Sequence, residues 1–268
     1  ILTYMTRYVD DGCLLGEPRF TSMILAGYRE KYKITSEGPD LMLGVKSTLS
    51  NEGRTIQLTQ PKWTDDFVKE FEEHIPNQRS VSTPLPPGTF VQRTGVPTEE
   101  QEKSRLQGIL YRAYGSMLWC ARNTCPQISL AISMMCSTVS EPTEEHIGLA
   151  MHMLKYIKSK RDVGIKFHRV KKPKLRAYFD ASNKHNRLDG KAYGGYIIML
   201  CGGPLHWEAR KLKHVGLGSP HNEYIAMAAC NRKVRHLRQL LAELHLSHWC
   251  EGPTTIMGDN LVANEHAR

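Results

Sequence analysis

The hydrophobic pattern of this chain changes its period near residue 175, and this change constrains the fold more than any other feature. Before it, apolar residues recur at helical spacing in three segments, residues 107–120, 126–139 and 143–159. After it, the pattern becomes that of strands at residues 175–179, 192–200 and 203–208, then of a long helix at 219–244 and a short strand at 254–257. Three strands, a helix and a strand predict a mixed sheet covered by a helix.

The N-terminal third predicts short strands and helices joined by turns. Residues 1–15 resemble two strands around the polar turn Asp10-Asp11-Gly12, in which Asp-Gly is a hairpin signal. We also expect helices at 18–32 and 64–74, strands at 41–49 and 55–58, and an extended proline-rich connection at 83–98. The strands at 41–58 are joined by the predicted turn Asn51-Glu52-Gly53. The chain as a whole is therefore predicted to be α+β or α/β.

Two adjacent carboxylates, Asp10 and Asp11, occupy the predicted hairpin turn. Such a pair can offer oxygen ligands to Mg²⁺, and polymerases hold two such ions roughly 3.5–4 Å apart for in-line phosphoryl transfer. The alternative is a solvated turn, where Asp is favoured for its own hydrogen bonds to the backbone. The residue types alone leave both interpretations open.

Three further carboxylates follow predicted strands or begin the long helix: Asp180, Glu223 and Asp259. Carboxylates at strand ends and on a covering helix can converge on one point of a sheet. Three of them form an all-oxygen Mg²⁺ site able to activate water and stabilise the leaving oxygen of a phosphodiester. Three separate surface acids or helix caps are the alternative that the residues leave open.

The charge of the chain is strongly basic, with a net charge of +9 and a pI near 9.2. A basic surplus favours a polyanionic partner, with nucleic acid before membrane, because phosphate binding releases condensed counterions. Residues 158–174 are rich in Lys and Arg and are interpreted as a basic hinge, either a soluble linker or a phosphate-binding track. The candidate phosphate contacts in it are Lys158, Lys160, Arg161, Lys171 and Lys172.

The cysteines and the apolar runs bear on where such a protein works. Seven scattered cysteines with no CxxC pair indicate reduced thiols in an intracellular protein. No apolar run reaches the roughly 18 residues of a membrane span, so we expect no membrane partner. Because the chain opens with Ile1 and closes at Arg268 within a predicted helix, we expect both ends to continue in a longer protein.

Several segments, in order along the chain, resemble the reverse transcriptase of copia-type long-terminal-repeat retrotransposons. Tyr8-Val9-Asp10-Asp11 resembles its active-site hairpin, and residues 40–45 resemble its "FLGI" strand with Met42 in place of the aromatic residue. Residues 58–63, 83–84, 111–119 and 123–128 are similar to its "LSQ–x–x–Y", "TP", "YR–x–x–GSLMY" and "TRPDI" segments. The resemblance implies that Asp10 and Asp11 bind metal in a polymerase site whose other aspartate lies upstream of Ile1.

The last third resembles the ribonuclease H domain of the same family. Residues 178–182 are similar to "YSDAD/S", and residues 207–224 align without a gap to "W–SSKKQ–x–x–VALSSTEAEY", which includes Arg210, Lys211 and Glu223. Gly258-Asp259-Asn260 matches its "DN" after a strand. The departures are Leu212 in place of Gln and Pro220-His221-Asn222 in place of Thr-Glu-Ala. The resemblance implies that Asp180, Glu223 and Asp259 are the metal ligands of a domain whose fourth carboxylate lies beyond Arg268.

The resemblance implies three regions: the C-terminal part of a palm at 1–58, a helical thumb or connection at 59–170, and a C-terminally incomplete ribonuclease-H-like mixed sheet with helices at 171–268. It implies two Mg²⁺ ions per site, with Mn²⁺ as a substitute. The expected partners are RNA–DNA hybrid, template–primer and the rest of the Pol polyprotein, that is, fingers, protease and integrase. Arg210 and Lys211 would contact nucleic acid. The location would be a cytoplasmic virus-like particle or the nucleus.

Two alternatives to an enzyme fragment of this family remain. The first is a catalytically inactive remnant that binds nucleic acid or a partner, which the altered segments 220–222 and 123–125 favour. The second is another ribonuclease-H-like nuclease, against which the hairpin at 8–11 argues.

Overall fold

The computed structural model describes residues 2–35, 40–75, 79–89, 91, 99–182 and 189–260. Half of the predicted proline-rich connection at 83–98 lies outside the described residues, as does the helix expected at the C-terminal end. Strands and helices are mixed, and all the strand pairs but one are antiparallel within the described part of the chain. This is the α+β organisation that the sequence predicts. No helix in the described ranges combines the length and apolar character needed to cross a membrane.

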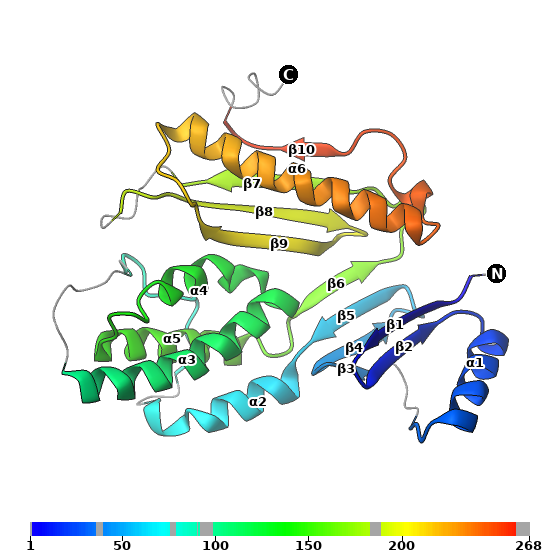
Figure 1. Ribbon diagram of the computed structural model, residues 1–268, viewed down its shortest axis with the longest axis horizontal. Helices are drawn as coiled ribbons and strands as arrows, with labels where there is room; N and C mark the ends of the chain where they lie inside the picture. Colours follow the sequence, from blue (N-terminus) through cyan, green and yellow to red (C-terminus); the bar gives the residue numbers. More distant parts are fainter. Residues whose placement is uncertain are drawn as a thin grey trace.

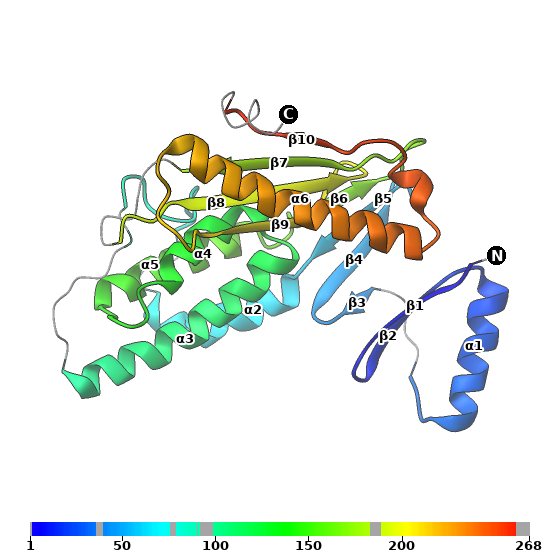
Figure 2. The ribbon, with the colours of Figure 1, turned by 45° about the horizontal axis from the view of Figure 1, so that its top comes forward.

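The N-terminal hairpin and helix form one end of the molecule (Figures 1 and 2). Strands β1 (Tyr4–Tyr8) and β2 (Asp11–Leu15) pair in a two-stranded sheet and are followed by α1 (Pro18–Lys31). The hairpin is confirmed, but its predicted turn at Asp10-Asp11-Gly12 is wrong. Tyr8 pairs with Asp11, so the loop is Val9-Asp10, and Gly12 lies within β2 opposite Arg7. Val9 has φ 53, a conformation that is rare and strained for a β-branched residue.

A second sheet has the order β3-β4-β5-β6, from β3 (Leu41–Met42), β4 (Val45–Ser50), β5 (Thr55–Thr59) and β6 (Ile165–His168). The predicted turn at residues 51–53 is confirmed, since all three residues have positive φ. The interpretation of residues 158–174 as a hinge needs correction, because this segment contains β6, which pairs with β5. Ile165 and Phe167 alternate with Lys166 and His168, a strand pattern that the surrounding lysines obscure.

Helices between β5 and β6 form the largest core. They are α2 (Pro61–Glu70), η1 (Glu72–His74), α3 (Glu100–Asn123), η2 (Pro126–Ile128), α4 (Ser129–Cys136) and α5 (Glu144–Ser159). Thr143 caps α5 in a capping box with His146, which satisfies backbone N–H groups at the start of the helix. Leu110, Met117 and Leu154 are among the side chains that are wholly buried between the helices. The three helices predicted at 107–159 are confirmed.

The third sheet has the order β10-β7-β8-β9 and carries α6 on one face (Figures 1 and 2). Its elements are β7 (Arg176–Ala181), β8 (Tyr193–Leu200), β9 (Gly203–Lys211), α6 (Ser219–Glu243), η3 (Ser247–Trp249) and β10 (Thr255–Met257). Ala226, Cys230 and Val234 of α6 pack with Phe179 and Ile198 of the sheet in a second core. Strand β10 runs parallel to β7, the one parallel pair among the described strands.

Strand β9 and the turn that precedes it join this sheet to the rest of the molecule. The indole Nε1 of Trp207 donates a hydrogen bond to the carbonyl oxygen of Ala121 in α3 at 2.7 Å. The backbone N–H of His168, in β6, donates to the carbonyl oxygen of Cys201 at 2.8 Å. The third sheet is therefore fixed both to the helices and to the second sheet.

Candidate metal centre

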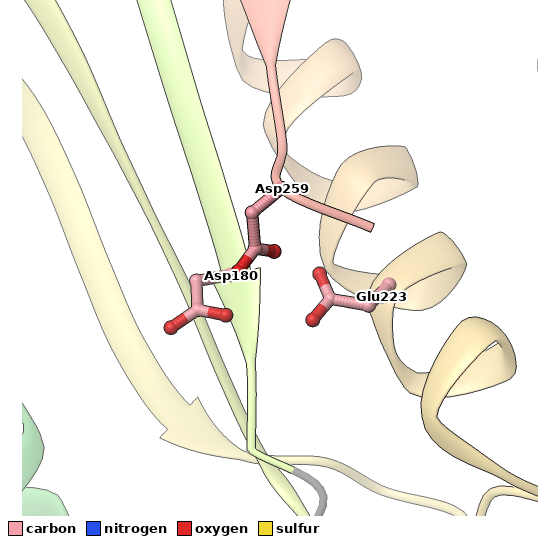
Figure 3. A group of neighbouring side chains, drawn as sticks. All are labelled: Asp180, Glu223 and Asp259. Carbon is pink, nitrogen blue, oxygen red and sulfur yellow. The ribbon is translucent and has the colours of Figure 1, made fainter. Parts of the chain in front are cut away.

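The third sheet brings three predicted carboxylates to one point (Figure 3). Asp180 lies on β7, Glu223 on the first turns of α6, and Asp259 two residues after β10. One oxygen from each lies within 4.8 Å of the others. The parallel register, in which Met257 pairs with Tyr178, explains the approach, because Asp259 and Asp180 each stand two residues further along these neighbouring strands.

Glu223 is the buried member of the cluster, with 3% of its surface exposed. Its Oε1 accepts a hydrogen bond from the backbone N–H of Ala181 at 3.2 Å, whereas its Oε2 has no partner among the described residues. Burial and the nearby charges of Asp180 and Asp259 together raise the pKa of Glu223 to about 7, against the opposing Ala181 hydrogen bond. A buried carboxylate oxygen without a partner is costly unless something positive binds it.

The donor set fits a hard divalent cation. Carboxylate oxygens are the ligands that Mg²⁺ and Ca²⁺ take in proteins, and Mg²⁺ is usually held by one or two carboxylates plus water and substrate oxygens. Asp180 and Asp259 are exposed, so a cation there would still be accessible to a ligand from solvent. Glu223 would supply its unpartnered Oε2 as a further ligand from the buried side of the cluster.

The titration of Glu223 predicts a pH dependence of stability in metal-free buffer. Its pKa is about 7 in the folded chain and 4.5 ordinarily, so between these values the folded state binds more protons than the unfolded state. The free energy of unfolding is therefore expected to fall by about 2 kcal/mol as the pH rises from about 5 to about 8. Urea unfolding with a chelator measures this slope.

Glu223→Gln is the matched control for this titration, because an amide of nearly the same shape does not ionise. The slope between about pH 5 and about pH 8 should become nearly flat in that variant. Mg²⁺ should stabilise the unsubstituted chain more at the upper end of the range, since metal binding requires the ionised carboxylate. An unchanged slope in Glu223→Gln would assign the titration to another group.

The surroundings of two residues next to the cluster, Gly258 and Asn222, could not be predicted from the sequence. Gly258 lies against the ring of buried Phe179, and a Cβ there would stand 2.2 Å from the ring Cζ. Asn222 is wholly buried beside Glu223, and neither its Oδ1 nor its Nδ2 has a partner among the described residues. A Cβ on Gly216 would stand 1.9 Å from that Oδ1. The sequence shows that a glycine precedes Asp259, but only the structure shows that the Phe179 ring leaves no room for a side chain there.

Asp10 and Asp11 belong to the N-terminal hairpin and not to the sheet that carries this cluster. Both are exposed, Asp10 in the two-residue loop of the hairpin and Asp11 as the first residue of β2. Within the described ranges, the cluster at Asp180 is the one group of three or more acidic, His or Cys side chains close enough to share a cation. The hairpin therefore presents a pair of carboxylates to which no other described residue adds a third ligand.

The predicted phosphate contacts are spread over several elements. Lys158 lies in the last turn of α5, and Lys171 and Lys172 are exposed after β6. Three of the predicted cations pair with carboxylates: Arg161 with Asp65 at 2.6 Å, Arg210 with Glu208 at 3.1 Å and Lys211 with Asp189 at 2.5 Å. The ammonium of Lys160 lies 5.9 Å from the centre of the Tyr156 ring.

Fold and donor set together define a class, that of α+β proteins with an all-carboxylate cluster able to hold a divalent cation. No family model matches the chain. A Pol polyprotein from transposon TNT 1-94 of Nicotiana tabacum is 27% identical over 242 residues, 89% of this chain and 18% of that protein. The Pol polyprotein from transposon RE1 of Arabidopsis thaliana is 26% identical, over 98% of this chain and 17% of that protein.

A shorter relative is covered much more completely. A transposon Ty5-1 protein of Saccharomyces cerevisiae is 32% identical over 227 residues, 83% of this chain and 70% of that protein. The chain belongs to the Pol proteins of copia-type retrotransposons, which confirms the resemblance seen in the sequence. It spans less than a fifth of the length of the full Pol polyproteins that it matches, 18% and 17% for the two above.

Proposed function

We propose that this chain is the part of a Pol polyprotein that hydrolyses the RNA strand of RNA–DNA hybrids, together with the last portion of the polymerase. Residues 1–58 are then the C-terminal part of the palm, 59–170 the thumb or connection, and 171–268 the ribonuclease H region. The observation that carries the proposal is the convergence of Asp180, Glu223 and Asp259 within 4.8 Å. Membership of the Pol family supports it.

The three carboxylates would hold the divalent cations, Mg²⁺ or in its place Mn²⁺. Two such ions bound together supply activation of a water molecule and stabilisation of the leaving oxygen of a phosphodiester. The residues of the chain fix the geometry: β7 and β10 hold Asp180 and Asp259 side by side, and the Ala181 N–H orients Glu223 through its Oε1. Exposure of the two aspartates leaves room for the scissile phosphate above them.

Cations around the third sheet would bind the phosphates of the hybrid. Lys171 and Lys172 are exposed, and Arg210 and Lys211 lie at the end of β9. Contacts of this kind fix the position of a duplex without reading its sequence. In the polymerase part, Asp10 and Asp11 would bind metal with a carboxylate from another part of the polyprotein.

Hydrolysis of labelled hybrid by the polyprotein that contains this chain tests the proposal. We expect cleavage of the RNA strand in hybrid and not in duplex RNA or duplex DNA, with loss of activity on chelation and recovery with Mg²⁺. Cleavage that persists in the chelator, or that does not distinguish hybrid from duplex DNA, contradicts it.

A catalytically inactive remnant is the second candidate, favoured by the buried amide of Asn222. Burying such an amide without hydrogen bonds costs about 1–3 kcal/mol, and it stands beside Glu223 where the family has Ala. A remnant would bind hybrid with an affinity that falls steeply with salt, yet show no Mg²⁺-dependent cleavage.

A further inference from the structure

A cavity of about 240 Å³ lies between α2 with η1 and α5, away from the carboxylate cluster. Its floor is apolar and consists of Val68, Ile75 and Leu154, of which Leu154 is wholly buried. Sites for drug-sized ligands have volumes of roughly 300–1,000 Å³. This smaller cavity therefore suits one large side chain or a fragment of that size.

The rim of the cavity is positively charged. Arg79, Lys155 and Lys158 line it, with Glu72 as the acidic member of the lining. Lys155 and Lys158 are three positions apart on α5 and so share one face of the helix. In the described part of the chain neither lysine has a carboxylate within ion-pair distance, so both are available to an anion.

We propose that this cavity docks a partner peptide that inserts one aliphatic or aromatic side chain onto the floor and places an acidic side chain against Lys155 and Lys158. Charge complementarity and the apolar floor together favour this occupant over nucleic acid. A phosphate backbone would use the lysines but leave the half-buried Val68 and Ile75 of the floor exposed to water. The described residues of the lining also include no aromatic ring on which a base would stack.

The proposal gives Lys158 a protein partner in place of the phosphate expected from the sequence. It is independent of the hydrolytic function, because no residue of the cavity belongs to the carboxylate cluster. It assigns an interaction surface to the helical region, in which α2 and α5 otherwise contribute to the core.

Two probes test the docking site on the full chain. Anilinonaphthalene sulfonate joins an apolar ring system to a negative charge and fluoresces when it leaves water. The dipeptide N-acetyl-leucyl-glutamate is the minimal match to the proposed peptide. We expect the dye to bind, the dipeptide to displace it, and the double substitution Lys155→Glu with Lys158→Glu to weaken dye binding by at least about tenfold.

Lys171→Glu with Lys172→Glu makes the same charge change outside the cavity and is the matched control, expected to leave dye binding within about twofold. An equal loss in both double variants, or displacement of the dye by RNA–DNA hybrid and not by the dipeptide, overturns the proposal. Should charge reversal unfold the chain, as thermal melting would show, Lys155→Gln with Lys158→Gln carries the same test with an expected loss of at least about threefold.

Discussion

Asp180→Asn is expected to lower Mg²⁺-dependent hydrolysis of RNA–DNA hybrid by at least about 100-fold. Replacing a residue that only hydrogen-bonds to a metal ligand already lowers metal affinity or activity by about 10- to 100-fold, and Asp180 would be a ligand itself. Asp180 stands on β7 with its carboxylate facing Glu223 and Asp259 (Figure 3). The amide keeps the shape of the side chain but removes the charge and one anionic ligand oxygen. Initial rates with the polyprotein, at saturating Mg²⁺, measure the loss.

Asp66→Asn is the matched control, since Asp66 is an exposed aspartate of α2 outside the cluster, and we expect it to be active within about twofold. Asp10→Asn provides a second comparison, with DNA synthesis lost and hybrid cleavage kept, because the hairpin lies in a different sheet. Full hydrolytic activity of Asp180→Asn would rule out the cluster as the catalytic centre. Isothermal titration with Mg²⁺ separates loss of the metal from loss of fold.

Gly258→Ala is expected to lower the free energy of unfolding by about 1–3 kcal/mol, the usual cost of forcing extra volume into a packed core. The new Cβ would stand 2.2 Å from Cζ of Phe179, whose ring is 4% exposed and cannot simply turn away. Relief of the clash moves the end of β10, and Asp259 moves with it. We therefore also expect Mg²⁺ affinity to fall by at least about tenfold. Urea unfolding and Mg²⁺ titration give the two values.

Gly115→Ala is the control for replacing a glycine by alanine at a position where the added Cβ meets no clash. Gly115 is an exposed residue of α3 with no atom within 4 Å of the position of an added Cβ, so alanine should be neutral or stabilising there. Phe179→Leu combined with Gly258→Ala should cost less than the sum of the single changes, because the shorter side chain removes the clash. Simple additivity would show that the Phe179 contact is not the cause.

The strength of the periodic pattern decides which elements can be predicted. Helix α5 begins where Thr143 and the following acids predict it, since capping is a local property. Helix α3 begins at Glu100, seven residues before the predicted start at 107, because its first turns are polar and lack the apolar spacing. Strand β6 was not predicted from the sequence, for a different reason. Its apolar residues are few, and its partner β5 is distant in the sequence.

The residues of the candidate site can be predicted from the sequence because the local pattern indicates where strands end and where the long helix begins. The resemblance then selects Asp180, Glu223 and Asp259 among the many acids of the chain. Burial of Glu223 and the raised pKa that follows depend on how α6 packs on the sheet, which no local pattern encodes. The turn of the N-terminal hairpin is misplaced in the prediction because pairing register, and not the Asp-Gly signal, decides which residues form the loop.

Pairing between β5 and β6 has a consequence for the order of folding. The two strands are separated by about a hundred residues, and the entropy lost on closing a loop grows with the logarithm of its length. We therefore expect the helices between them to form their local contacts first and to bring the strand ends together, which shortens the effective loop. During synthesis the second sheet cannot be completed until the whole helical segment and β6 have left the ribosome, and until then the edge of β5 that pairs with β6 is unpaired.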